Sequence, residues 1–106
     1  MNRRILLLLL AMPLATLAAE PGPVLVIKDH RFLPAELRVP AGQKIRLTID
    51  NQDQGPEEFE SHELNREKIV PGRSKGIVFI GPLKPGRYAF FGEFNPKTAQ
   101  GVIVAE

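Results

Sequence analysis

The chain has 106 residues and no cysteine, so we expect one domain with a modest core and no stabilising disulfide. Its 14 basic and 12 acidic side chains nearly balance. The sequence has no Lys/Arg cluster and no basic amphipathic stretch, which argues against nucleic acid as a partner and against binding at a membrane surface.

The N-terminal stretch has the pattern of a secretory signal peptide. Arg3 and Arg4 precede an apolar run over 5–10 and then Ala-rich sequence. That run is too short to span a bilayer. We therefore expect residues 1–19 to be removed on export and 20–106 to form the mature domain in the periplasm, with no membrane insertion after cleavage. Loss of the two arginines would make basic and acidic residues equal in number.

Short apolar or alternating runs, separated by Pro and Gly, predict an all-β Greek-key sandwich of about eight strands. In the clearest run, Ile45, Leu47 and Ile49 alternate with polar residues. No stretch has convincing helical periodicity. In chain order, the predicted strands are 24–28, 36–39, 44–50, 57–61, 67–70, 75–80, 87–91 and 102–105.

The stretch 55–64 places four carboxylates and one imidazole within ten residues. If it is extended, Phe59 points into the core, and Glu58, Glu60 and His62 share the opposite face. Like charges on one face destabilise a sheet, so basic side chains or a bound cation must offset them.

The chain is expected to turn after this stretch and return as a strand over 67–70. This hairpin predicts that His62 lies opposite Glu67, with Glu60 diagonal to that pair. Oxygen and imidazole donors in such a group suit iron, manganese, copper(II) or zinc. Glu57, at the start of its strand, and Glu93, in a distant loop, are further candidate ligands.

A solvated charged face is the plainer interpretation of the same residues. Arg66, Lys68, Arg73 and Lys75 are close in sequence and would then neutralise the carboxylates as surface ion pairs, each contributing little.

Several motifs along the chain resemble those of the cupredoxin domain, which implies a cupredoxin-like sandwich. A type 1 copper site needs two His, a Cys thiolate and a weak axial ligand. By motif position, Glu57, Gly92, Asn95 and Ala99 stand where those ligands would be, so we expect no type 1 copper site. The motifs are Phe32-Leu33-Pro34, Val39-Pro40-Ala41-Gly42, the 45–51 strand, and the segments 83–91 and 101–104.

A narrower resemblance is to the EfeO-type cupredoxin-like domain of bacterial periplasmic iron-uptake systems. Glu58-Phe59-Glu60, and Glu67 ahead of Pro71-Gly72, match carboxylate motifs of that family. Some of its members carry cysteines where this chain has Phe32 and Gly92. The resemblance implies a metal site with iron, or alternatively copper, as the cofactor. The expected ligands are Glu58, Glu60, Glu67 and Glu93, with Glu57 and His62 as additional candidates.

The same resemblance implies a periplasmic iron-binding protein and a membrane iron permease as partners. Hard carboxylate oxygens favour Fe(III) over Fe(II), so an accessory ferroxidase role is open, as is simple delivery of the ion. The alternative is a metal-free periplasmic interaction module that recognises a protein through its acidic face and Phe94. We expect His30 to be a surface or corner residue, and Tyr88 to anchor a corner through its hydroxyl.

Overall fold

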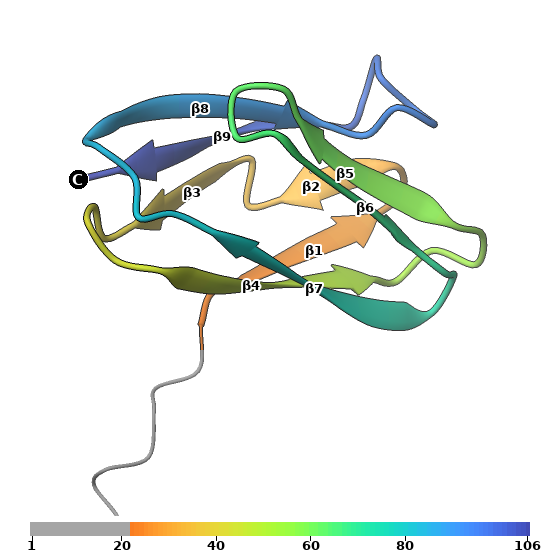
Figure 1. Ribbon diagram of the computed structural model, residues 1–106. Helices are drawn as coiled ribbons and strands as arrows, with labels where there is room; N and C mark the ends of the chain where they lie inside the picture. Colours follow the sequence, from red (N-terminus) through yellow and green to blue (C-terminus); the bar gives the residue numbers. More distant parts are fainter. Residues whose placement is uncertain (1–21) are drawn as a thin grey trace, which may run out of the picture.

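Nine strands make up residues 22–106, the part of the chain that the computed structural model describes (Figure 1). The predicted signal peptide, 1–19, lies outside the described residues. Within 22–106 there is no helix, and hence none that could cross a bilayer. The strands are β1 (Val24–Lys28), β2 (Arg31–Leu33), β3 (Glu36–Val39), β4 (Ile45–Asn51), β5 (Glu57–Ser61), β6 (Arg66–Val70), β7 (Ser74–Ile80), β8 (Gly86–Phe91) and β9 (Gln100–Ala105).

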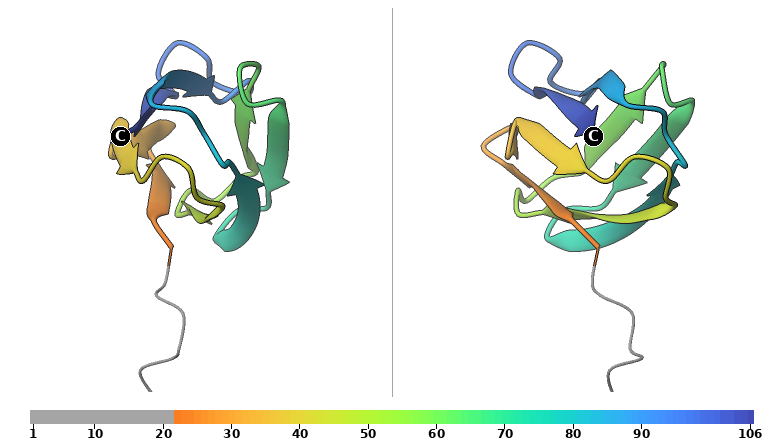
Figure 2. Two further views of the ribbon diagram at one scale, coloured as in Figure 1. Left: turned by 60° about the vertical axis from the view of Figure 1, so that its left-hand side comes forward. Right: turned by 90° about the vertical axis from the view of Figure 1, so that its left-hand side faces the viewer.

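The strands form two packed sheets, which Figure 2 shows as two layers. One sheet has the order β2-β1-β4-β7 and the other the order β3-β9-β8-β5-β6. β1 pairs with β4 in parallel, as β3 does with β9, and the other pairs are antiparallel. The predicted all-β sandwich is confirmed.

The eight predicted strands are all present, with ends that differ by at most two residues. β2 was not predicted, because it is only three residues long and has a single buried side chain, Phe32. β2 pairs with β1 through a tight turn in which Asp29 and His30 adopt φ values of 54° and 58°. Asp and His are among the non-glycine residues that adopt such φ values more often, but this turn has no Gly or Pro, the residues that separated the predicted strands.

The core consists of apolar side chains that alternate along the strands, as the period of two requires. Phe32, Phe59 and Phe90 form its aromatic centre, with the Phe90 ring centroid 4.9 Å from that of Phe32 and 5.2 Å from that of Phe59. Tyr88 anchors a corner as predicted, because its hydroxyl donates a hydrogen bond of 2.7 Å to the Lys84 carbonyl.

Four connections gather at one end of the sandwich, on the right in Figure 1. They are the β1–β2 turn (29–30), the β4–β5 loop (52–56), the β6–β7 turn (71–73) and the β8–β9 loop (92–99). We call this end the loop end. It brings polar residues from distant parts of the sequence close to the start of β5.

Candidate metal centre

Glu58, Glu60 and Glu67 lie on the face of β5 and β6 opposite the core residue Phe59, and Glu93 lies in the β8–β9 loop. We call these four residues the carboxylate cluster. Glu58 and Glu60 alternate along β5 with the core residue Phe59, which is fully buried. Glu60 lies directly opposite Glu67 in the β5–β6 register. Two carboxylates therefore face each other across a strand pair, an arrangement that is unfavourable unless a proton or cation lies between them.

The predicted pairing of His62 with Glu67 was wrong. The last β5–β6 pair is Ser61 with Arg66, so residues 62–65 form the turn, and the Asn65 N–H donates to the His62 carbonyl. This register differs from the predicted one by two residues. A shift of two keeps each side chain on its face, which is why Glu67 still lies beside Glu60.

Glu58 is the buried centre of the carboxylate cluster. It is 1% exposed, and its Oε1 accepts a 2.8 Å hydrogen bond from the backbone N–H of Glu93. Glu58, Glu60 and Glu93 each offer a carboxylate oxygen within 4.8 Å of the others. The β8–β9 loop thus brings the Glu93 carboxylate, from a distant segment, beside Glu58 and Glu60.

Burial raises the pKa of Glu58 to about 7, helped by a hydrogen bond with Glu67 and the nearby charge of Glu60, and opposed by the Glu93 N–H. The neighbouring Glu60 side chain is 16% exposed. Its Oε1 is buried and has no hydrogen-bond partner among the described residues. Both observations indicate that the ionised carboxylates of Glu58 and Glu60 have too few hydrogen-bond donors around them.

Basic side chains do not neutralise the carboxylate cluster. Within 22–106, no Lys or Arg forms an ion pair with any of its four members. Arg66, the nearest candidate in sequence, donates through Nε to the carbonyl of Phe79 and through Nη1 to that of Asn65. The structure therefore does not support the plainer interpretation of a face neutralised by surface ion pairs.

His62 lies at the rim of the cluster. Its Nδ1 is 3.8 Å from Glu60 Oε2, and its side chain is 78% exposed. The imidazole packs on Phe91 with 5.3 Å between ring centroids. An open hollow of ≈ 290 Å³ lies here, lined in part by Glu60, His62 and Glu67. This hollow connects the cluster with solvent.

Glu57 points to the opposite side of β5 and does not join the carboxylate cluster. It is 1% exposed, and its Oε2 lies 2.7 Å from His30 Nδ1. His30, Asp53 and Glu57 form a second group whose donor atoms lie within 4.8 Å of one another. His30 and Asp53 were not predicted as ligands, because only the pairing of β1 with β4 brings their turn and loop together.

The positions expected for type 1 copper ligands do lie near one another at the loop end. Asn95 Nδ2 donates to Glu57 Oε1 at 3.3 Å, and the Gly92 N–H donates to the Ala99 carbonyl at 2.9 Å. A Cβ at Gly92 would come within 2.8 Å of the Glu58 carbonyl oxygen. Neither a thiolate nor space for one exists at position 92, so these residues do not fit type 1 copper.

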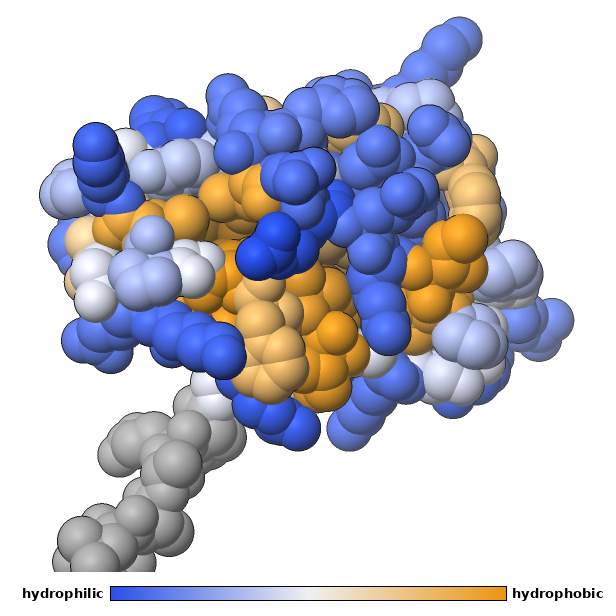
Figure 3. Space-filling model, in the orientation of Figure 1, coloured by the Kyte–Doolittle hydropathy of each residue, from blue (hydrophilic) through white to orange (hydrophobic). Residues whose placement is uncertain are grey.

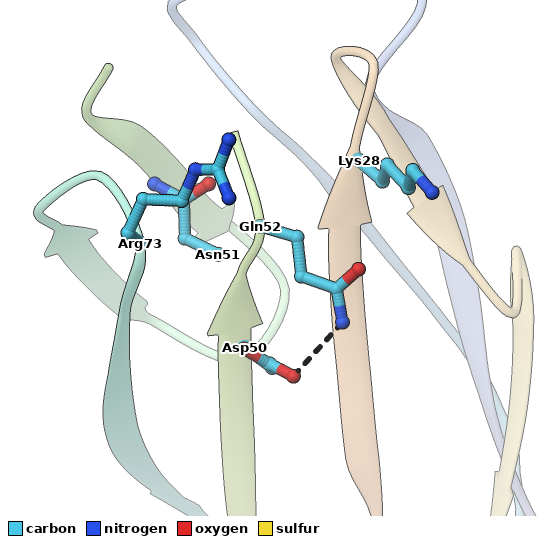
Figure 4. A pocket seen from close by; sticks show the side chains of 5 residues that line it. All are labelled: Lys28, Asp50, Asn51, Gln52 and Arg73. Atoms are coloured by element: carbon cyan, nitrogen blue, oxygen red, sulfur yellow. Dashed lines mark hydrogen bonds between the residues drawn. The ribbon is translucent and has the colours of Figure 1, made fainter. Parts of the chain in front are cut away.

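Apart from the carboxylate cluster and the His30-Asp53-Glu57 group, residues 22–106 hold no group of three or more His, Asp or Glu side chains close enough to share a metal ion. The polar hollow in Figure 4 has Lys28 and Arg73 on opposite sides, and its one carboxylate, Asp50, accepts a hydrogen bond from Gln52. The face in Figure 3 carries a hydrophobic region bordered by hydrophilic side chains. Ile69 on β6 and Phe79 on β7, edge strands of the two different sheets, are among the exposed hydrophobic residues.

Two mixed sheets, parallel pairing of β1 with β4 and of β3 with β9, and a polar loop end define a cupredoxin-like sandwich. The sequence model of the family described as cupredoxin-like domain matches residues 4–105. The chain therefore belongs to the cupredoxin-like domain family. Such a fold suggests a metal-binding or redox-related role.

The uncharacterized protein RP394 of Rickettsia prowazekii (strain Madrid E) is 51% identical over 80 residues, covering 76% of this chain. This chain spans 64% of the length of that relative.

Among solved structures, a reduced amicyanin variant has a TM-score of 0.66 at 19% identity, covering 87% of this chain and 89% of that chain. A Cu(I) form of another amicyanin variant gives 0.66 at 18% identity, with the same coverage of 87% and 89%. A chain of a heme-copper terminal oxidase dimer has a TM-score of 0.66 at 19% identity, covering 80% of this chain and 65% of that chain. At sequence identities of 18–19%, these comparisons show a shared fold and nothing more.

Proposed function

We propose that this protein binds a transition metal ion, iron in the first place and copper as the alternative, at the carboxylate cluster. Glu58, Glu60, Glu67 and Glu93 are the proposed ligands, with His62 at the rim as an additional donor. Glu57 belongs to the opposite side of β5 and is not part of this proposed ligand set.

One observation carries the proposal, namely buried carboxylate that no Lys or Arg of residues 22–106 pairs with. Glu58 is 1% exposed, and Glu60 Oε1 is buried with no partner among the described residues. Burial of a charged group is costly unless it is paired or coordinates a metal. A bound cation would satisfy Glu60 Oε1 and relieve the repulsion between Glu60 and Glu67.

The donor set supports iron because its members are carboxylate oxygens. Hard oxygen ligands suit hard, highly charged ions, so they bind Fe(III) more strongly than Fe(II). The resemblance of the Glu58-Phe59-Glu60 motif to EfeO-type domains also supports a periplasmic role in iron uptake. On that proposal the protein passes iron to a periplasmic iron-binding protein and a membrane permease.

Binding can be tested by calorimetric titration of chelator-treated protein with Fe(II), Fe(III)-citrate, Cu(II), Zn(II) and Mn(II). We expect saturable binding that weakens at least about tenfold in Glu60→Gln/Glu67→Gln. The matched control is Glu36→Gln/Glu106→Gln, which changes two exposed carboxylates that pair with Arg38. Equal affinities in the two double variants would contradict the proposed site. Failure of every ion to bind would favour the metal-free interaction module.

An accessory ferroxidase role follows if the site prefers Fe(III). Each Fe(II) would lose one electron to an added oxidant. That oxidant is either Cu(II), which becomes Cu(I), or dioxygen, which takes four electrons and four protons to become two water molecules. The test is the steady-state rate of Fe(II) oxidation in the presence of the protein, with buffer and Glu60→Gln as references. A rate equal to both references would remove the oxidase role and leave delivery of the ion.

A further inference from the structure

A second group of donor atoms lies at the loop end, on the interior side of β5. His30 comes from the β1–β2 turn, Asp53 from the β4–β5 loop and Glu57 from the start of β5. One donor atom of each lies within 4.8 Å of the other two. The group is separate from the carboxylate cluster because Glu57 and Glu58 point to opposite faces of the strand.

Backbone hydrogen bonds hold these donors in place. Both carboxylate oxygens of Asp53 accept backbone N–H groups of the β1–β2 turn, Oδ1 from Asp29 at 2.7 Å and Oδ2 from His30 at 3.0 Å. Asn51 Oδ1 accepts the N–H of Asp53 at 2.9 Å, which fixes the loop. The donors are therefore positioned before any ligand arrives, which lowers the ordering cost of binding.

The two carboxylates of this group outnumber the basic side chains that pair with them. Glu57 is 1% exposed, and the Asp53 side chain is 13% exposed. Within residues 22–106 their one ion-pair partner is the imidazole of His30, at 2.7 Å from Glu57 and 3.6 Å from Asp53. Two largely buried carboxylates thus share a single imidazole, and a divalent cation would neutralise them more completely.

We propose that His30, Asp53 and Glu57 form a second metal site, which takes a divalent ion of the borderline class such as Cu(II) or Zn(II). One nitrogen and two oxygen donors suit this class better than the all-oxygen carboxylate cluster does. The ion replaces the proton between His30 Nδ1 and Glu57 Oε2. Because no sulfur takes part, the site is distinct from type 1 copper.

Access to the site comes from an open hollow of ≈ 380 Å³ between the β1–β2 turn and the β8–β9 loop. His30, Asn95 and Thr98 are among its lining residues. The His30 side chain is 57% exposed, so its outer edge faces solvent. Water or a small anion can therefore complete the coordination of the ion.

The chain contains two histidines, His30 and His62, which makes a spectroscopic test decisive. The purified protein, without a histidine tag, is loaded with one equivalent of Cu(II), and electron spin echo modulation from the remote nitrogen of a bound imidazole is recorded. We expect His62→Asn, in which His30 is the one remaining imidazole, to retain this modulation, and the addition of His30→Asn to abolish it. Asparagine tolerates the left-handed φ of position 30, so the turn is preserved.

An absence of imidazole modulation in His62→Asn would overturn the second site, because His30 is then the one imidazole left in the chain. Asp53→Asn provides an independent readout, with Cu(II) affinity expected to fall at least about tenfold. Circular dichroism of each variant checks that the sandwich is intact. Glu60→Gln/Glu67→Gln should leave the modulation unchanged, so failure of the carboxylate cluster and failure of this site are distinguishable.

Discussion

Glu58 is a carboxylate that the fold buries beside three others, and its protonation therefore affects stability. Its pKa rises from the ordinary 4.5 to about 7, chiefly through burial. The folded state then binds the proton more tightly than the unfolded state does. The free energy of unfolding of the metal-free protein should fall as pH rises from about 4.5 to about 7, by about 3 kcal/mol.

The Glu58→Gln variant should lose most of this pH dependence, because glutamine is neutral throughout. Urea unfolding of both proteins at pH 5 and pH 8 measures it. A smaller dependence of the same sign should remain, since the pKa values of His30 and Glu57 are also raised, that of His30 by its hydrogen bond with Glu57 and that of Glu57 by burial. An equal pH dependence in both proteins would show that Glu58 is not the responsible group.

Gly92 is required by close packing rather than by a special backbone angle. A Cβ there would lie 2.8 Å from the Glu58 carbonyl oxygen and 3.0 Å from the Ala99 Cβ. Gly92→Ala should lower the free energy of unfolding by about 1–3 kcal/mol through overpacking. Gly55→Ala is the control, because a Cβ at Gly55 meets nothing within 4 Å. Similar urea midpoints for the two variants would contradict this packing argument.

At the scale of elements, side-chain hydrogen bonds add to the backbone pairing of β5 with β8. The two strands share one register pair, Glu60 with Phe91. Beyond it, both backbone groups of Ala89 are satisfied by side chains. Ser61 Oγ donates to the Ala89 carbonyl at 2.7 Å, and the Ala89 N–H donates to Glu63 Oε1 at 2.7 Å. This junction positions the carboxylate cluster relative to the β8–β9 loop.

Ser61→Ala should therefore destabilise the protein by about 1–3 kcal/mol, because it leaves the Ala89 carbonyl without its donor. Urea unfolding measures the loss. Ser74→Ala is the reference, since that hydroxyl donates to the Gly72 carbonyl within a turn two residues away. A loss no larger than that of Ser74→Ala would mean that other contacts hold β5 to β8.

At the scale of the whole molecule, metal binding should stabilise the sandwich. The carboxylate cluster joins β5, β6 and the β8–β9 loop, so an ion held there binds only the folded chain. At a free ion concentration of about 100 times the Kd, the expected gain is about 2.7 kcal/mol. Thermal unfolding with and without a chelator measures it. The same gain in Glu60→Gln/Glu67→Gln would place the ion elsewhere.

The strands and the outward face of the acidic stretch could be predicted because these features depend on neighbours in sequence. Alternation around Ile45 and Phe59, with Pro and Gly between runs, predicted eight of the nine strands. It also placed Glu58 and Glu60 on one face. The β5–β6 register was predicted two residues out, because turn length is set by local hydrogen bonds that composition does not reveal.

The sequence by itself determined the class of fold and the side of each strand on which a side chain lies, because a period of two and turn chemistry act over a few residues. Only the tertiary structure decided that Glu58 is buried and that Glu93 reaches it. The same holds for His30, Asp53 and Glu57, whose group depends on contacts between residues 23 to 27 positions apart. Such contacts form only when β1 pairs with β4 and the two sheets pack, since pairing and burial act between segments that are distant in sequence.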